Sequence, residues 1–315
     1  MPATGDRSYR GRTLAPTPDP AQEAPISIGL RPRSLGEILD AAFRLYKADF
    51  GLYFLTSILA AAPLAFLMIL GYVSDDSSVA FGLLVMVLLP VAMVAWITLW
   101  PAISYQMDRR LHGAAPGVGE AWRWGIRRFF RVLWAWLLAY LMLVLFMIPT
   151  FILLGILGVL VGESTVGMGI WMFAIALFIL GLGGFWTGRV FLALPAMVAE
   201  DLSGFGSLTR AWGLSRKGWF GLSMLFGLVS IIWFAPTLGI YGVTGTFAML
   251  WDPDAVSTGA VSVGALVAQQ LLGTLAAGVT MPYFIAVMQV AYYDRRIRSE
   301  AYDLETATDA LLSEA

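Results

Sequence analysis

Side chains that could carry out acid–base or metal chemistry are few in this sequence and lie far apart. The chain has 315 residues, no cysteine and a single histidine, His112. It therefore has no disulfide, no thiolate nucleophile and no multi-histidine metal site. Asp108, Glu200 and Asp201 are the acids that a lipid-modifying enzyme at the membrane surface would use, but their spacing defines no carboxylate pair.

Recognised catalytic motifs are also missing from the sequence. It contains no G-x-S-x-G elbow, no H-E-x-x-H zinc motif and no phosphate-binding glycine loop. His112 lies in the segment LHGAAPG, which is typical of a solvated loop. We therefore expect no catalytic residue, no bound metal and no cofactor.

The most polar patch inside an apolar stretch consists of Gln269, Gln270 and Thr274. Such side chains could bind a small solute or a lipid headgroup. Polar side chains in membrane helices more often form hydrogen bonds to a neighbouring helix or to backbone. Both interpretations stay open on the sequence alone.

The composition indicates that most of the chain is surrounded by lipid. Apolar residues make up 59% and charged residues 13% of the sequence. An average soluble domain has roughly 45–50% apolar and about 25% charged residues. A soluble protein of this size has too little interior to bury so much apolar surface.

Six apolar stretches are long enough to cross a hydrocarbon core of about 30 Å, which requires about 20 residues. None contains Asp, Glu or Lys. They predict an all-α, polytopic membrane protein whose six-helix transmembrane domain covers 31–305, between a disordered cytoplasmic tail at 1–30 and a second tail at 306–315. The stretches cover about 51–73, 79–104, 132–161, 166–190, 220–245 and 262–290.

The distribution of basic residues predicts the topology. Of the 20 Lys and Arg residues, 7 precede the first stretch, 6 lie at 105–131, 4 at 188–219 and 3 follow the last stretch. The three intervening turns contain only acidic charges. Basic loops stay in the cytoplasm during insertion, so both termini are expected to be cytoplasmic, and the location is expected to be the plasma membrane.

An internal repeat is indicated by three segments that begin near Ser34, Pro116 and Ser203. Each has an acidic or serine helix start and an amphipathic stretch with basic residues that leads into an apolar stretch. Between the second and third segments a constant offset of 87 relates Gly119 to Gly206 and Pro149 to Pro236. We interpret this as three tandem units, each an amphipathic interfacial helix followed by a transmembrane hairpin. Chance alignment of common glycines and prolines is the alternative.

The amphipathic segments are expected to lie in the cytoplasmic interface with their apolar faces towards lipid. Ser34 and Glu37 form a capping-box pattern at the start of the first segment. Each basic residue there gains about 1 kcal/mol from anionic lipid. The candidate contacts to lipid or to a protein partner are Arg44, Lys47, Arg123, Arg127, Arg131, Arg210, Arg216 and Lys217. No feature indicates nucleic-acid binding.

Two further patterns are typical of membrane helices. The tryptophans Trp122, Trp124, Trp134 and Trp136 are expected to form an interfacial anchor belt. The pair Gly184 and Gly188 puts small residues on one helix face and predicts close helix packing.

Three segments give the chain a resemblance to a known family. RPRSLGEILDAAFRLYKADF at 31–50 resembles the opening motif of the bacterial glycerophosphoryl diester phosphodiesterase membrane domain. The segment 194–220 is similar to a later motif of that family, and the segment 292–305 to its closing motif. In these two motifs the matching residues are Pro195, Glu200, Arg210, Trp212, Lys217, Gly218, Tyr293, Asp294, Arg296, Arg298, Glu300, Asp303 and Leu304.

The resemblance has limits. Arg295, Ser299 and Ala301 depart from the family pattern, and the specific motifs cover only part of 31–305. The resemblance implies a multi-pass membrane domain of unknown biochemical role. The catalytic domain that gives the family its name is missing here, so the resemblance implies no phosphodiesterase activity.

These observations favour a non-enzymatic integral membrane protein with a scaffolding, sensing or lipid-contacting role. A transporter or permease for a small or lipid-like solute is the second hypothesis. It is weakened because ion-coupled transporters usually place ionisable residues near the midplane. An interfacial lipid-modifying enzyme that uses Asp108, Glu200 and Asp201 is the third.

Overall fold

The computed structural model describes residues 32–73, 79–161, 165–251 and 262–300. Every regular element in these ranges is a helix. The all-α prediction is therefore confirmed for this part of the chain. The two tails predicted at 1–30 and 306–315 lie outside the described residues.

The long helices follow the predicted apolar stretches closely. Five of them are long and apolar enough to cross a membrane, namely α2, α3, α5, α9 and α11. Helix α6 forms at the fourth predicted stretch but is not one of these five, so the sixth crossing stays a prediction. The bounds are α2 Phe50–Val73, α3 Val79–Leu111, α5 Phe129–Val161, α6 Thr165–Val190, α9 Trp219–Trp251 and α11 Val263–Glu300.

Four short helices complete the described chain: α1 Leu35–Ala48, α4 Val118–Arg127, α7 Ala193–Ala199 and α8 Gly204–Ser215. The capping box is confirmed, because Ser34 N donates to Glu37 Oε2 at 2.7 Å and Glu37 N donates to Ser34 Oγ at 3.4 Å. Helix α7 was not predicted, since seven mostly small apolar residues give no amphipathic pattern. A short helix precedes each hairpin, as tandem units require, but the repeat itself stays a prediction.

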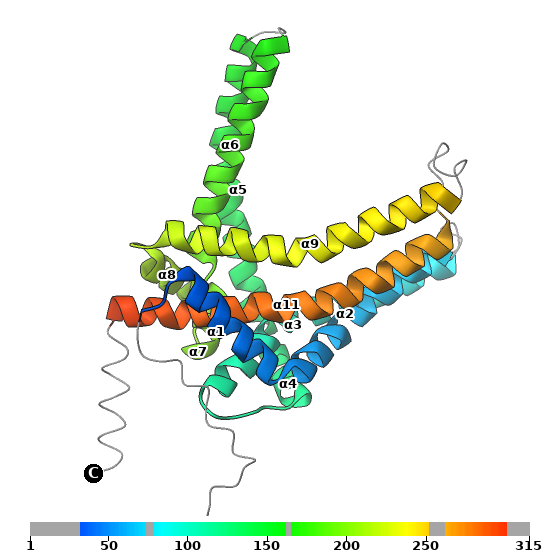
Figure 1. Cartoon of the computed structure of the whole chain (residues 1–315), viewed down its shortest axis with the longest axis vertical. Coiled ribbons are helices and arrows are strands. Elements are labelled where there is room, and N and C mark those ends of the chain that lie inside the picture. Colours follow the sequence, from blue (N-terminus) through cyan, green and yellow to red (C-terminus); the bar gives the residue numbers. More distant parts are fainter. Residues whose placement is uncertain (1–31, 74–78, 162–164, 252–261, 301–315) are drawn as a thin grey trace, which may run out of the picture.

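The helices form two arms that leave a common base (Figure 1). The hairpin arm is α5 with α6, and it points upward in this view. The lateral arm consists of α2, α3, α9 and α11, which extend to the right. We call the region where α1, α4, α7 and α8 lie, together with the ends of the long helices, the base. The arms expose many large apolar side chains, such as Val79 and Val159, at 80% and 83%.

The apolar face of α1 packs on protein. Ala42 and Leu45 are fully buried in the same core as the α11 residues near Ile285. Tyr46 Oη donates to the Val279 carbonyl at 2.9 Å, and Tyr283 Oη donates to the Leu39 carbonyl at 3.3 Å. The expectation that this face contacts lipid is therefore wrong for α1, because the second half of α11 offers an apolar surface that covers it.

Close packing at the predicted glycine pair is confirmed. Ser223 Oγ on α9 donates to the carbonyl of Gly184 on α6. A Cβ atom at Gly188 would collide with the Trp219 carbonyl and the Ser223 hydroxyl. The two backbones approach closely only because Gly188 has no side chain, and this contact joins the hairpin arm to the lateral arm near the base.

Candidate functional site

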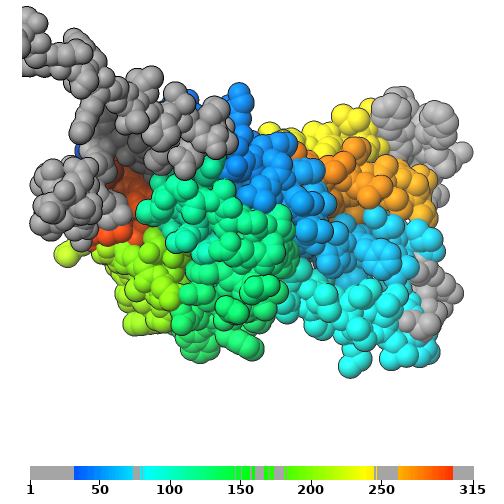
Figure 2. Space-filling model, turned by 90° about the horizontal axis from the view of Figure 1, so that it is seen from below, coloured from blue at the N-terminus to red at the C-terminus, as the bar shows by residue number. Residues whose placement is uncertain are grey.

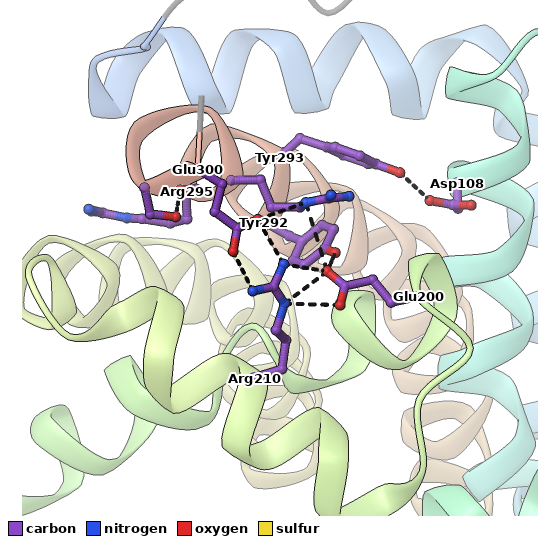
Figure 3. Close-up of polar contacts among 9 residues, drawn as sticks. Asp108, Glu200, Arg210, Tyr292, Tyr293, Arg295 and Glu300 are labelled. Carbon is purple, nitrogen blue, oxygen red and sulfur yellow. Dashed lines mark hydrogen bonds and ion pairs between the residues drawn. The ribbon is translucent and has the colours of Figure 1, made fainter. Parts of the chain in front are cut away.

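An ion-pair cluster joins three helices in the base (Figure 3). Glu200 follows α7, Arg210 lies on α8, and Tyr292, Arg296 and Glu300 lie on α11. Arg210 Nε is 2.9 Å from both carboxylate oxygens of Glu200, and Arg210 Nη2 donates to Glu300 Oε2 at 2.7 Å. Tyr292 Oη also donates to Glu200. We call these five residues the base clamp.

Arg210 is the central cation of the base clamp. Hydrogen bonds to Glu300 and then to Glu200 raise the pKa of Arg210 above its ordinary value. The guanidinium therefore stays charged and unable to act as an acid or base. Arg296 adds a second cation, with Nε 3.3 Å from Glu300 Oε2 and 3.8 Å from Glu200 Oε1. The arrangement fixes α7, α8 and α11 to one another and leaves neither carboxylate without a cation.

A buried polar chain lies between α3 and α11. Ser104 Oγ donates to Gln289 Oε1 at 2.9 Å, and Gln289 Nε2 donates to Asp108 Oδ1 at 2.9 Å. Tyr293 Oη donates to the same Asp108 oxygen at 2.6 Å. His112 Nδ1 lies 2.7 Å from the Asp108 carbonyl, and its side chain is about half exposed. The donors satisfy Asp108, which explains how a carboxylate is buried here.

The three acids of the enzyme hypothesis lie in three separate environments. Asp108 is in the buried chain and Glu200 is in the base clamp. Asp201 pairs with Arg128 at 2.8 Å and Arg131 at 3.0 Å. The hydrogen bond from Arg128 is the main reason why the pKa of Asp201 lies below its ordinary value. Within the described ranges, no group of three His, Asp or Glu side chains could hold a metal ion.

The predicted lipid-contacting cations divide into two groups. Arg131 and Arg210 are held in ion pairs with acids of the base, although the Arg131 side chain is also exposed, at 47%. The other six have exposed side chains on α1, α4 or directly after α8; among them Arg44 pairs with the equally exposed Asp40. Seen from below, the surface around α4 lies between α1 and the region of α7 and α8 (Figure 2). The exposed group comprises Arg44, Lys47, Arg123, Arg127, Arg216 and Lys217.

The polar patch on α11 forms local hydrogen bonds. Thr274 Oγ1 donates to the Gln270 carbonyl at 2.7 Å, and Gln270 Nε2 is 3.3 Å from the Thr274 hydroxyl. Gln269 and Gln270 are half-buried. The Thr274 hydroxyl therefore finds its hydrogen-bond partners within α11 itself. A role of the patch in binding stays a prediction.

An apolar cavity of about 490 Å³ lies where the two arms meet. Its walls come from α3, α5, α6, α7, α8, α9 and α11, and they do not include Gln269, Gln270 or Thr274. Nine of its twenty lining residues are aromatic, and five of these are tryptophans: Trp96, Trp100, Trp136, Trp186 and Trp233. We call this space the aromatic cavity.

Trp136 was expected in an interfacial belt, but it lines the aromatic cavity. Its ring centroid lies 5.7 Å from that of Trp100 in an edge-to-face arrangement. Trp134, two positions earlier on α5, is 54% exposed and points to the outside of the protein. The two side chains differ because neighbouring positions on a helix face different directions, which a cluster of tryptophans in the sequence does not reveal.

Sequence reasoning did not predict the base clamp or the aromatic cavity. One signal was present, because Glu200, Arg210, Arg296 and Glu300 all belong to the motifs that carry the family resemblance. The structure brings these four residues together across 100 positions of sequence. In comparisons with protein-family models, curated proteins and solved structures, nothing matches this chain. The resemblance therefore stays a prediction.

Proposed function

We propose that this chain is a non-enzymatic protein of the bacterial plasma membrane that crosses the bilayer six times and contacts anionic lipid through its base. The observation that carries the proposal is the separation of surfaces. Exposed cations lie on α1, on α4 and after α8 in the base, whereas the arms expose large apolar side chains. A base at the cytoplasmic interface puts the cations at phosphate level and the arms in hydrocarbon.

The arrangement of acids supports a role without catalysis. Glu200 and Asp201 are each paired with arginines, and Asp108 accepts hydrogen bonds from Gln289 and Tyr293. A general base needs a lone pair that is free to take a proton from a substrate. The pairing favours a structural role for these acids over the lipid-modifying enzyme.

Topology can be tested directly because the natural chain has no cysteine. Single-cysteine variants Arg127→Cys and Glu163→Cys are treated with a membrane-impermeant maleimide in intact and in permeabilised cells. We expect Glu163→Cys to react in intact cells and Arg127→Cys to react only after permeabilisation. The cysteine-free chain is the control for background labelling. Labelling of Glu163→Cys only after permeabilisation refutes the orientation.

Lipid contact is tested by reconstitution in phosphatidylglycerol and phosphatidylcholine mixtures. Arg123 and Arg127 are exposed on α4, and each is expected to contribute about 1 kcal/mol of preference for anionic lipid. The double variant Arg123→Glu/Arg127→Glu should lose enrichment of phosphatidylglycerol around the protein. Gly119→Ala is the matched control, since a Cβ there meets nothing within 4 Å. Equal enrichment in all three proteins contradicts the proposal.

Transport of a lipid-like solute is the second candidate, and the aromatic cavity is the observation that favours it. Its lining is almost entirely apolar, which suits a hydrocarbon rather than an ion. Uptake of a fluorescent phospholipid by proteoliposomes separates this candidate from a static lipid contact, because only a transporter accelerates movement between leaflets.

A further inference from the structure

We propose that the aromatic cavity binds one acyl chain of a phospholipid from the cytoplasmic leaflet. The inference rests on the proposed membrane embedding and goes beyond the lipid contact of the base, because it assigns a specific internal site. Its volume of about 490 Å³ lies within the range of roughly 300–1,000 Å³ that is usual for ligand sites.

The chemistry of the walls selects hydrocarbon. Trp100 forms edge-to-face pairs with Trp136, Trp233 and Phe284, with centroids 5.7, 6.3 and 6.0 Å apart. Aliphatic side chains such as Val132 and Met197 complete the lining. Such a surface offers dispersion contacts and few hydrogen-bonding groups, so a saturated chain fits it better than a polar solute.

The depth of the cavity matches one leaflet. On α5 the lining residues occur from Val132 to Leu143, which is eleven steps of about 1.5 Å, or about 16 Å along the helix axis. Half of a hydrocarbon core of about 30 Å is about 15 Å. Val132 directly follows Arg131, which pairs with Asp201 at the base. Along α5 the cavity therefore extends from next to the base over a length comparable with one leaflet.

A cation lies on α6 between two lining residues in the sequence, although its own side chain is not part of the lining. Arg189 stacks between the rings of Phe185 and Trp212, with its guanidinium carbon 5.1 and 4.8 Å from the two centroids. Its Nη1 donates to the Trp212 carbonyl at 3.3 Å, and no described carboxylate forms an ion pair with it. Its neighbours Thr187 and Val190 line the cavity. A lipid phosphate is the anion that membrane surroundings supply at this level.

The indole N–H of Trp100 is a second polar group near the cavity. Nε1 of Trp100 is buried, and no residue in the described ranges accepts a hydrogen bond from it. Trp100 lines the cavity with its ring, and a rotation of that ring would offer Nε1 to an ester carbonyl of a bound lipid. In this proposal the phosphate lies near Arg189, the ester near the indole and the acyl chain among the rings.

The test uses phosphatidylglycerol that carries a diazirine in one acyl chain, in nanodiscs containing the full chain. After irradiation, cross-linked residues are mapped by mass spectrometry. We expect labelling of cavity-lining residues that saturates at low probe concentration. The same diazirine on phosphatidylcholine and on a free fatty acid identifies the source of the chain. Labelling by the fatty acid alone overturns the phospholipid assignment.

Two substitutions on α5 form a matched pair. Ala139→Trp fills the cavity, because Ala139 lines it, whereas Leu137→Trp adds the same ring at a position that is 53% exposed. Saturable labelling should fall at least several-fold in Ala139→Trp and stay unchanged in Leu137→Trp. The smaller substitution Ala139→Leu should give an intermediate loss of saturable labelling. It replaces Ala139→Trp in the test if that variant does not fold.

The outcomes separate this proposal from the proposed function. Equal cavity labelling by phosphatidylglycerol and phosphatidylcholine supports the acyl-chain site and argues against a headgroup role for Arg189. Arg189→Gln is then expected to behave like the natural protein. Labelling that is non-saturable and unaffected by Ala139→Trp overturns the acyl-chain site, while the anionic preference of the base, measured separately with the α4 variants, is unaffected.

Discussion

A close backbone contact between α8 and α5 in the base provides the most informative substitution. Gly204 is the first residue of α8 and lies against the backbone of α5. A Cβ atom at this position would be 2.7 Å from the Arg131 carbonyl oxygen and 2.8 Å from the Ala135 backbone nitrogen. Ordinary contact needs at least 3.4 Å. Gly204→Ala therefore forces α8 and α5 apart by about 0.7 Å, because neither the new Cβ atom nor the α5 backbone can rotate away from the clash.

The expected cost is about 1–3 kcal/mol of unfolding free energy, the usual penalty for overpacking a close contact. Gly213→Ala, in the last turn of the same helix, is the control. Its Cβ atom meets nothing within 4 Å, so we expect a gain of up to about 1 kcal/mol from helix propensity. The two variants share one chemical change on one helix and differ only in their surroundings.

The assay is equilibrium unfolding in mixed detergent micelles of increasing denaturing-detergent content, followed by tryptophan fluorescence. Because Ala135 also lines the aromatic cavity, Gly204→Ala should additionally reduce saturable acyl-chain labelling. Equal unfolding free energies for the two variants, or a more stable Gly204→Ala, refute the inferred backbone contact between α8 and α5.

Three further predictions concern charge and arm geometry. Arg210→Gln should lower the unfolding free energy by about 1–3 kcal/mol, because it removes charged hydrogen bonds to two half-buried acids. The control Arg44→Gln breaks an exposed pair and should change the unfolding free energy by at most about 0.5 kcal/mol. Because the pKa of Asp201 is lowered in the folded chain, its contribution to folding stability is present above about pH 4 and is lost as the pH falls further. Asp201→Asn should therefore be destabilised less by acid than the natural protein, as measured by unfolding at a series of pH values. If both arms insert into one bilayer, as proposed, they should turn towards a common normal and close about the base. Spin labels on cysteines at Leu153 and Leu238 should then be closer together in nanodiscs than in detergent by double electron–electron resonance, and an unchanged distance would contradict this closure.

The sequence predicted the long helices well because lipid imposes a simple constraint. A backbone in hydrocarbon must satisfy its own hydrogen bonds, so an apolar stretch of sufficient length becomes a helix. The start of α2 at Phe50 and of α5 at Phe129 lie within three residues of the predicted starts at 51 and 132. The capping box at Ser34 was predictable for a related reason, since its partners are three residues apart.

The base clamp and the aromatic cavity depend on contacts between distant segments. Arg210 meets Glu300 across 90 positions, and Tyr292 meets Glu200 across 92. Periodicity shows which face of a helix is apolar, but not which other helix covers it. That is why the apolar face of α1 was assigned to lipid although α11 covers it, and why the inward direction of the Trp136 side chain was not predicted.

The two arms leave the base in different directions, yet one bilayer imposes one normal on both (Figure 1). Transmembrane helices tilt by about 20° on average, within a range of about 0–40°. In the proposed six-crossing topology, insertion of both arms therefore favours their closure about the base, where Gly188 holds α6 against α9. Closure brings Tyr140 of α5 towards Trp233 of α9, and both line the aromatic cavity. In the acyl-chain proposal, binding of the chain and the angle between the arms are therefore coupled. A lipid that stabilises one angle between the arms binds more tightly to protein that is held at that angle.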